Sequence, residues 1–451
     1  MNVVLLSGGS GQRLWPLSND SRSKQFLKIL SSEGGNQSMA QRVWGQLKKA
    51  QLSSSTLIST SKSQVDMIID QIGRDVPLVI EPERRDTFPA IALAAAYLYS
   101  VKSVLLEEVV TVLPVDPYVD DAFFQTIKEL EHTVINSKAN LALIGALPTH
   151  PSEKYGYIVP DQHESSPYMN VKQFMEKPKE EVAQSIIKEN GLWNCGVFAF
   201  KLDYIISYLQ QNGFPIQYDE LLKSYHLLPK KSFDYEIVEK EPDIVVLPYK
   251  GFWKDLGTWN TLTEEMKTHQ IGPGKACERS INTHIINELD IPVAVLGISN
   301  TVVVASHDGI LVTEKEASPT IKSVLSSIEK QARYKELSWG WWKELDRSYA
   351  DDEVLTRKVV VKGGKHLTFE TGHDRTVTWN VTKGTGSIQL QDSTQIIQPG
   401  VVFSLKAGES ITVRTKEEVE IIEIQRGSKH ALKKLTYSNE KWEEVEKAIS
   451  L

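Results

Sequence analysis

The sequence predicts an α/β fold in which a mostly parallel sheet carries helices on both faces, followed by a short β-rich extension and a small all-β domain. Three observations support this prediction. Short β-branched runs alternate with helix-like stretches over about the first 265 residues, the pattern changes near Met266, and strands separated by turns dominate residues 356–427. At about 150 residues per domain, the chain of 451 residues has room for three domains, with two as the alternative because large α/β units often exceed that size. We place them at residues 1–265, 266–337 and 338–451.

The first region reads as a Rossmann-like arrangement of strands and helices. Apolar runs predict buried strands at residues 3–6, 109–115, 141–144, 197–200 and 244–247. Helical patterns at residues 90–101 and 123–133 lie between these runs. Continuous apolar strands that alternate with helices are typical of a parallel sheet buried on both faces.

The rest of the chain reads mainly as strands and turns. Short strands are predicted at residues 293–296, 302–304 and 310–312, and an amphipathic helix is predicted at residues 319–337. The aromatic cluster of Trp339, Trp341 and Trp342 follows, and we interpret it as a joint between domains. Regular strands and turns over residues 356–427 favour a small β-sandwich or barrel, and residues 440–451 favour a closing helix.

Composition argues against several classes of protein. The chain has 51 basic and 58 acidic residues, whereas dedicated nucleic-acid binders usually carry a basic excess. Cys195 and Cys277 are too few for a disulfide framework or a zinc cluster. No window approaches 18 apolar residues, and the first apolar run is short and lacks a preceding basic region. We therefore expect a cytoplasmic protein that binds neither nucleic acid nor membranes.

A glycine-rich turn follows the first predicted strand directly, and it contains Ser7, Gly8, Gly9 and Gly11. Such a turn lets backbone N–H groups approach a phosphate, and the next helix adds the positive end of its dipole. The turn is not a Walker loop, because Gln12-Arg13 stands in place of Lys-Ser/Thr. It is not a dinucleotide fingerprint either, because Leu14 replaces the third glycine. A tight turn without a ligand therefore stays open on the glycines alone.

Three cations follow within one loop of the turn: Arg13, Arg22 and Lys24. Singly, each is more often a solvated surface charge. As a set they favour a nucleotide site, because cations beside a phosphate cradle stabilise the charge that builds on a departing pyrophosphate.

Further motifs run in order along the first region. The first extends from Gly8 to Ser18 and is followed by Lys24-Gln25-Phe26. The others lie at residues 81–87, 89–94, 155–158, 174–178, 193–196, 233–235 and 253–259. Together these segments resemble the sugar-1-phosphate nucleotidyltransferases, and within that family they are most similar to the mannose-1-phosphate guanylyltransferases. The resemblance covers residues 1 to about 265.

The resemblance implies an enzyme of the EC 2.7.7 class that joins a sugar 1-phosphate to a nucleoside triphosphate and releases pyrophosphate. The favoured substrates are mannose 1-phosphate and GTP, and the product is then GDP-mannose. The sugar phosphate is itself the nucleophile, so catalysis needs positioning and charge neutralisation rather than a triad. The family's Mg²⁺ ligands correspond to Asp116 and Asp255, and carboxylate oxygens suit that ion. Without the family match, each aspartate could be a helix cap or a turn residue. The family also implies a homodimer.

The resemblance assigns the other site residues to three groups. The catalytic group is Arg13, Lys24, Asp116, Lys177 and Asp255. The nucleotide-binding group is Ser7, Gly8, Gly9, Gly11, Arg13, Lys24, Arg85, Asp86, Thr87 and Asp116. The sugar-binding group is Gly156, Glu176, Lys177, Asn194 and Asp234.

Four positions depart from the family's pattern: Ser23, Asp86, Pro117 and Lys254. They leave the phosphate and metal groups intact. They leave the base and the sugar open, because one misplaced hydrogen bond can change selectivity strongly. Another hexose or a heptose 1-phosphate is therefore an alternative substrate. A sugar-nucleotide-binding regulatory protein with little turnover is an alternative function.

The last two regions also resemble parts of this family. Residues 282–312 resemble its short β-rich extension, where we expect a packing or dimerisation surface. Residues 356–427 resemble the cupin-like phosphomannose isomerase domain of bifunctional members. An isomerase site needs clustered imidazole and carboxylate ligands. Here the ligand positions hold Gly372, Asp374, Val377 and, roughly, Glu409, and His373 alone is more often a turn residue. We therefore expect a cupin-like domain without a metal site or isomerase activity, with a bifunctional enzyme as the alternative.

Overall fold

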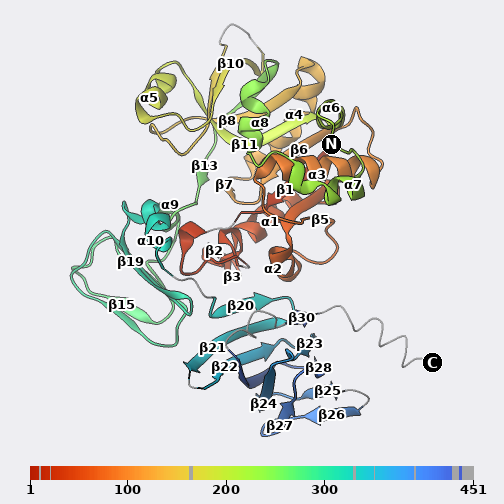
Figure 1. The fold of residues 1–451 in the computed structure, drawn as a ribbon. Helices are drawn as coiled ribbons and strands as arrows, with labels where there is room; N and C mark the ends of the chain where they lie inside the picture. Colours follow the sequence, from red (N-terminus) through yellow and green to blue (C-terminus); the bar gives the residue numbers. More distant parts are fainter. Residues whose placement is uncertain are drawn as a thin grey trace.

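A nine-stranded sheet forms the centre of the first region in the computed structural model (Figure 1). The structure describes residues 1–9, 12–20, 22–161, 166–328, 332–349, 351–390, 393–428 and 436–438. The sheet order is β5-β4-β1-β6-β11-β8-β12-β10-β9. The strands are β1 (Asn2–Ser7), β4 (Thr56–Ser61), β5 (Leu78–Glu81), β6 (Val109–Pro114), β8 (Leu141–Ala146), β9 (Tyr157–Pro160), β10 (Met169–Met175), β11 (Leu192–Lys201) and β12 (Ile244–Tyr249). All run in one direction except β10 and β11. The predicted α/β class with a mostly parallel sheet is confirmed.

Helices cover both faces of this sheet because successive side chains of each strand point to opposite sides. Val3 and Leu5 pack in the core beneath α1 (Met39–Lys49), α2 (Val65–Gln71) and α4 (Ala122–Ser137). Val4 packs in the opposite core, beneath α3 (Thr87–Ser100), α6 (Leu202–Gln211), α7 (Tyr218–Lys223) and α8 (Phe233–Glu236). The predicted strands and the two predicted helices correspond to observed elements.

Several shorter elements follow the ends of the strands in this sheet. Strand β7 (Pro117–Val119) pairs with β13 (Trp253–Asp255), which places Asp255 opposite Pro117. Helix α5 (Glu180–Lys188) follows β10, and α9 (Trp259–Glu264) follows β13. A short hairpin of β2 (Leu30–Ser32) and β3 (Gly35–Gln37) precedes α1.

The β-rich extension packs directly against the glycine-turn region. One of its sheets has the order β14-β16-β18-β19, and a smaller one pairs β15 with β17. The bounds are β14 (Gln270–Ile271), β15 (Gly274–Ala276), β16 (His284–Asn287), β17 (Val293–Val295), β18 (Thr301–Ser306) and β19 (Gly309–Glu314). Val302 and Val304 of β18 share an apolar core with Leu14 and Trp259, so the extension braces the loop after β1.

The predicted helix at residues 319–337 is wrong. The structure has a 3-10 turn, η7 (Ser318–Thr320), one short helix, α10 (Ile321–Leu325), and a strand, β20 (Tyr334–Leu337). Serine hydroxyls compete with a continuing helix, because Ser323, Ser326 and Ser327 each bond a carbonyl three residues back. Strand β20 is recruited by pairing with β21.

The C-terminal region is a sandwich of two antiparallel sheets (Figure 1), which confirms the predicted small all-β fold. The first sheet has the order β20-β21-β22-β29-β24-β27, and the second has the order β26-β25-β28-β23-β30. The bounds are β21 (Gly340–Tyr349), β22 (Glu353–Val361), β23 (His366–Glu370), β24 (Arg375–Lys383), β25 (Gly386–Leu390), β26 (Ser393–Ile397), β27 (Val402–Leu405), β28 (Ser410–Thr415), β29 (Val419–Gly427) and β30 (Thr436–Ser438). The predicted closing helix at residues 440–451 lies outside the described residues.

The tryptophan cluster belongs mainly to the core of this sandwich. Trp339 and Trp342 are buried among its apolar side chains, which corrects their interpretation as a domain joint. The joint lies beside them, where Ser338 donates to Asp66 at 2.6 Å and Lys362 pairs with Asp70 at 2.7 Å.

Among the described helices, none is long and apolar enough to cross a membrane.

Candidate active site

A cavity of about 240 Å³ opens where β1, β5 and β6 end. The carboxyl ends of parallel strands are where open α/β sheets usually bind ligands. The predicted nucleotide residues that line it are Ser7, Gly8, Gly9, Lys24, Arg85, Asp86, Thr87 and Asp116. Gly11 lies outside the described residues, and Arg13 is exposed on η1 (Gln12–Leu14) outside this lining.

Two glutamines, neither of them a predicted site residue, hold the glycine turn in place. The Gln25 amide donates to Ser7 Oγ at 3.2 Å, and the Gln64 amide donates to the Gly9 carbonyl at 2.9 Å. Both glutamines are buried. Because Gln25 follows Lys24 directly, the same bonds anchor the backbone that carries the Lys24 side chain.

Asp86 and Arg85 are engaged with the protein itself. Asp86 has a φ of 73° and caps α3, and its carboxylate accepts the Thr87 N–H at 2.8 Å. Arg85 donates to the Leu228 carbonyl at 3.0 Å and pairs with Glu83 at 2.9 Å. Asp86 therefore contributes first to the start of α3, the helix that borders the cavity.

Glu81 is a buried carboxylate in this cavity, and the motif at residues 81–87 predicts no role for it. Glu81 is 5% exposed, and the Tyr225 hydroxyl donates a hydrogen bond to its Oε2 at 2.8 Å. A Cβ atom on Gly8 would lie 2.8 Å from Oε1, so this oxygen lies directly against the glycine turn. Burial raises the pKa of Glu81 above its ordinary value. Among the described residues, Tyr225 is the only hydrogen-bond donor to this carboxylate.

Lys24, Asp116 and Asp255 meet at one point beside the cavity. The Lys24 ammonium lies 2.6 Å from Asp116 Oδ2 and 3.3 Å from Asp255 Oδ1. Burial alone would lower the pKa of Lys24, but the attraction of the two carboxylates outweighs it and raises the pKa. Two carboxylates that reach one cation can also reach a divalent ion. Two protein oxygens with substrate phosphates and water are a usual Mg²⁺ environment, so these residues fit that ion.

The five predicted sugar residues form a second cluster built by β10, β11 and α8. The Asn194 backbone N–H donates to the Gly156 carbonyl at 2.8 Å, and its side-chain amide donates to Asp234 at 2.8 Å. Lys177 pairs with Glu176, and a Cβ on Gly156 would collide with the Glu176 carboxylate. Burial and the neighbouring Glu176 charge raise the pKa of Asp234 to about 7.

Arg22 does not belong to the site, contrary to its interpretation as a phosphate-loop cation. It is buried, and its guanidinium lies 2.7 Å from Glu288 and 3.6 Å from Glu336. It therefore holds the extension and β20 against the first region. The extension brings a different cation, Lys322, close to Arg13, because α10 packs on η1. Burial and the charge of Arg13 lower the pKa of Lys322.

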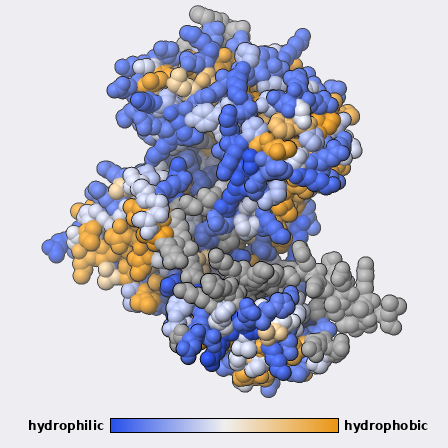
Figure 2. All heavy atoms as spheres, viewed as in Figure 1, coloured by the Kyte–Doolittle hydropathy of each residue, from blue (hydrophilic) through white to orange (hydrophobic). Residues whose placement is uncertain are grey.

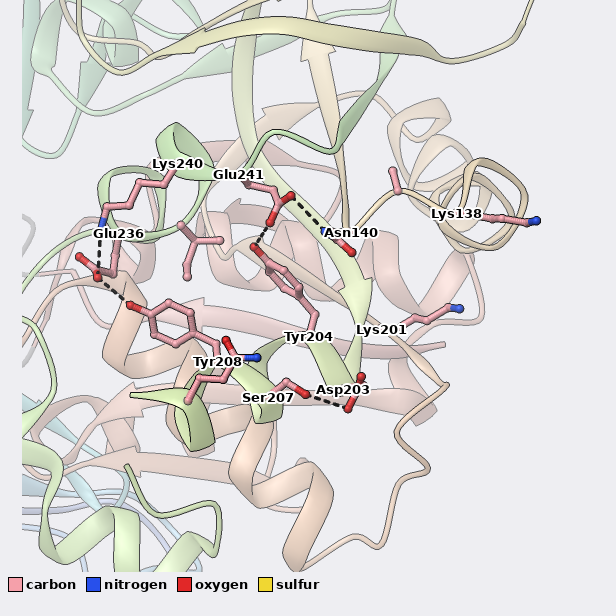
Figure 3. A pocket seen from close by; sticks show the side chains of 13 residues that line it. Lys138, Asn140, Lys201, Asp203, Tyr204, Ser207, Tyr208, Glu236, Lys240 and Glu241 are labelled. Atoms are coloured by element: carbon pink, nitrogen blue, oxygen red, sulfur yellow. Dashed lines mark hydrogen bonds and ion pairs between the residues drawn. The ribbon is translucent and has the colours of Figure 1, made fainter. Parts of the chain in front are cut away.

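A larger cavity, of about 590 Å³, lies elsewhere (Figure 3). Its lining contains none of the predicted site residues. It contains two partly buried tyrosine–glutamate pairs, in which Tyr204 donates to Glu241 at 2.6 Å and Tyr208 donates to Glu236 at 2.7 Å. Size alone therefore does not mark the functional site of this protein.

The inward face of the C-terminal sandwich carries buried charges rather than an evident metal centre. The Arg375 guanidinium, whose side chain has no solvent exposure, lies 3.2 Å from Glu353 and donates to Gln425 at 3.0 Å. Trp379 donates to the buried Glu423 at 2.8 Å. Within the described ranges, no group of three or more His, Cys, Asp or Glu side chains could hold a metal ion.

Comparisons with known proteins show which family the chain resembles. A family model described as Nucleotidyl transferase matches residues 2–270. The chain is 28% identical over 464 residues to the xanthan biosynthesis protein XanB of Xanthomonas campestris pv. campestris (strain B100), which covers 94% of this chain and 95% of that protein. It is 26% identical over 436 residues to mannose-1-phosphate guanylyltransferase 2 of Escherichia coli O157:H7, with 88% of each chain covered. A crystal structure described as mannose-1-phosphate geranyltransferase from Thermus thermophilus matches with a TM-score of 0.60 and 26% identity, covering 72% of this chain and 98% of that one.

Proposed function

The chain belongs to the nucleotidyl transferase family, and from that premise we propose that it joins mannose 1-phosphate to GTP, forming GDP-mannose and releasing pyrophosphate. The observation that carries the proposal is the meeting of Lys24, Asp116 and Asp255 beside the glycine-turn cavity. The names of the similar proteins favour mannose and guanine as the two specificities. The alternative is the same reaction on another hexose or a heptose 1-phosphate.

Both clusters border this meeting point. Lys24 and Asp116 line the nucleotide cavity. In the sugar cluster, Tyr155 is the neighbour of Gly156. Burial together with the charge of Asp255 raises the pKa of Tyr155 to about 12, so Tyr155 lies close to Asp255. A triphosphate whose base lies in the cavity would therefore extend its phosphates towards the sugar-binding cluster, as the reaction requires.

In the proposed reaction, an oxygen of the sugar phosphate attacks the α-phosphorus of the triphosphate. The bond from that phosphorus to the β-phosphate oxygen breaks, and the electron pair leaves with pyrophosphate. Mg²⁺ held by Asp116 and Asp255 would supply further neutralisation of phosphate charge. Lys24 and Arg13 stabilise the leaving pyrophosphate, and Lys177 positions the attacking phosphate. Neither a covalent intermediate nor a protein nucleophile is needed.

Glu81 supports guanine as the base. Guanine presents two adjacent donors, its ring N–H and its exocyclic amino group, whereas adenine presents a ring acceptor at the same position. A buried carboxylate with a single protein donor can accept both guanine bonds. We therefore assign base selection to Glu81, supported by the backbone of Gly8 and Gly9.

The direct test is pyrophosphate release with Mg²⁺ across a grid of nucleoside triphosphates and sugar 1-phosphates. We expect the strongest signal with GTP and mannose 1-phosphate. A signal with another sugar would keep the reaction and change the substrate. No release from any pair, with the triphosphate still bound, would favour the sugar-nucleotide-binding regulatory protein.

The residue assignments are tested by Lys24→Ala and Asp255→Ala, which should each lower kcat by orders of magnitude while the fold survives. The matched control is Lys254→Ala. Lys254 also has two carboxylate partners, Glu264 at 2.6 Å and Glu265 at 2.7 Å, but neither belongs to the proposed site. Near-normal kcat in either site variant would remove that residue from the mechanism.

We also propose that the C-terminal sandwich has no isomerase activity. The buried Arg375–Glu353 pair fills part of its interior with mutually neutralised groups. Interconversion of mannose 6-phosphate and fructose 6-phosphate, measured over a series of divalent metals, should stay at background. Metal-dependent turnover would restore the bifunctional alternative.

Finally, we propose a homodimer that forms through the extension. Figure 2 shows an apolar area over that part of the molecule. The exposed apolar side chains of the extension include Ile281 (69% exposed), Ile291 (70%), Leu296 (74%), Ile298 (48%), Ile310 (63%) and Val312 (61%). Apolar patches larger than a few hundred Å² usually mark protein interfaces. A second copy of the chain provides the same apolar surface, so the patch can cover itself across a two-fold axis.

Sedimentation of the full chain tests this interface. Leu296→Asp together with Ile310→Asp should convert a dimer to a monomer, because two carboxylates would be desolvated at the contact. The control is Leu105→Asp, a residue 65% exposed on the first region. A dimer that survives the double change, or a wild-type monomer, would contradict the proposal.

A further inference from the structure

The carboxylates of Asp116 and Asp255 are brought together by the backbone rather than by Lys24. Asp255 lies on β13, opposite Pro117 of β7, so the residue directly after Asp116 is paired with it. The β6 end of this arrangement is fixed by the bond from the Val115 N–H to the Leu6 carbonyl at 3.0 Å. A Cβ on Gly257 would lie 3.0 Å from Asp255 Oδ2, so the lack of a side chain there gives this carboxylate its space.

Lys24 is anchored at its backbone but not along its side chain. It begins η2 (Lys24–Phe26), where Gln25 is bonded to Ser7 and Phe26 is buried in the core. Among the described residues, Asp116 and Asp255 are the only hydrogen-bond or ion-pair partners of its ammonium. The Lys24 side chain is 24% exposed and lines the nucleotide cavity, so its ammonium has space to turn from the carboxylates towards the cavity without moving the backbone.

These two carboxylates would repel each other without a cation between them. The ammonium supplies that cation from within the chain. A divalent ion that binds the same two oxygens must displace it, since both need the space between the carboxylates. The displaced ammonium then needs a new anion, and the phosphates of a bound triphosphate are the nearest groups of that kind that the proposed reaction supplies.

Resting on the proposed function, we propose that Lys24 is a built-in substitute for the divalent ion. Its ammonium holds Asp116 and Asp255 ready and moves to the triphosphate when the ion takes its place. Lys24 therefore acts as a positioning residue for the metal ligands as well as a phosphate contact. One consequence is that the free protein binds divalent ions weakly, while nucleotide and ion bind cooperatively, each favouring the departure of Lys24.

The test measures Mn²⁺ binding to the full chain by the loss of the free-ion electron paramagnetic resonance signal, without substrates. Lys24→Met removes the internal cation and keeps the length of the side chain. We expect it to bind Mn²⁺ at least tenfold more tightly than the wild type. The control is Lys254→Met, whose lysine has 22% exposure and two carboxylate partners, and it should bind as the wild type does.

Two further variants keep the result interpretable. Lys24→Gln repeats the charge removal with a polar side chain, in case Lys24→Met misfolds. Adding Asp255→Asn to either variant should abolish the gain if the ion binds these carboxylates. Equal or weaker Mn²⁺ binding after loss of the lysine charge would overturn the inference, as would a gain that persists with Asp255→Asn. Wild-type turnover tests the proposed function separately, so the two can fail independently.

Discussion

Replacing Glu81 by glutamine should change which triphosphate the protein prefers. The substitution keeps the shape of the side chain and leaves a carbonyl oxygen that can still accept the Tyr225 hydroxyl bond at 2.8 Å. It removes the negative charge and puts an amide donor where one acceptor oxygen had been. Against guanine, one charge-assisted bond is lost and two donors are brought face to face.

A hydrogen bond to a charged group contributes about 1.5–3 kcal/mol, so the loss of one such bond should cost about 2 kcal/mol. At about 1.4 kcal/mol per factor of ten, kcat/KM for GTP should fall about 30-fold. The value for ATP should stay the same or rise, because the amide can donate to the ring acceptor of adenine. The ratio of GTP to ATP should therefore fall by about 30-fold or more.

The assay is steady-state pyrophosphate release with each triphosphate in turn at saturating sugar 1-phosphate. The matched control is Glu241→Gln, since Glu241 also accepts a tyrosine hydroxyl bond, at 2.6 Å from Tyr204, but lines the other large cavity. An unchanged GTP-to-ATP ratio in Glu81→Gln would refute base reading by this carboxylate. Equal losses with both triphosphates would show that Glu81 supports the glycine turn without selecting the base.

Three further changes test the sugar cluster and the C-terminal domain. The pKa of Asp234 is raised to about 7, so its carboxylate forms as the pH rises through neutrality. KM for the sugar phosphate should therefore fall from pH 6 to 8 in the wild type and stay constant in Asp234→Asn. The same raised pKa means that Asp234 stabilises the fold at low pH and that this contribution is lost as the pH rises through about 7, so the wild-type Tm should fall relative to the variant. Gly156→Ala should raise KM for the sugar phosphate, because its Cβ would displace Glu176; an unchanged KM would place the sugar elsewhere. Glu353→Leu should lower the free energy of unfolding of the sandwich by about 3–5 kcal/mol, because it leaves the buried Arg375 without a carboxylate. Denaturant titration would measure this loss, and turnover should show an unchanged kcat. A loss below about 1 kcal/mol would contradict the reasoning.

Local sequence patterns were enough to locate the strands and the glycine turn. The apolar runs that became β1 and β8 are continuous, and Thr111 alone interrupts that of β6. Each run ends at a glycine, proline or polar residue, so the conformation of these strands depends mainly on nearby residues. The motif resemblance likewise located residues that the fold brings into two clusters. The predicted helix at residues 319–337 failed because its apolar spacing competed with serine side chains and with strand pairing to a distant segment.

Arg22 and Glu81 show where sequence reasoning stopped. Arg22 lies within one loop of the glycines, yet its partner Glu288 is 266 residues away, and only the packed extension brings them together. Glu81 ends an ordinary strand, and its meaning depends on burial and on Tyr225, 144 residues further along. Neither partner can be inferred from neighbouring residues.

By itself, the sequence determined the class of fold, the glycine turn and the kinds of side chain available for phosphate, metal and sugar, because these depend on local pattern and on chemical type. The tertiary structure decided which of these groups meet. Asp116 and Asp255 share one ammonium because two short strands from distant parts of the chain pair with each other. Electrostatic interactions depend on distance through space, and the folded chain alone sets that distance.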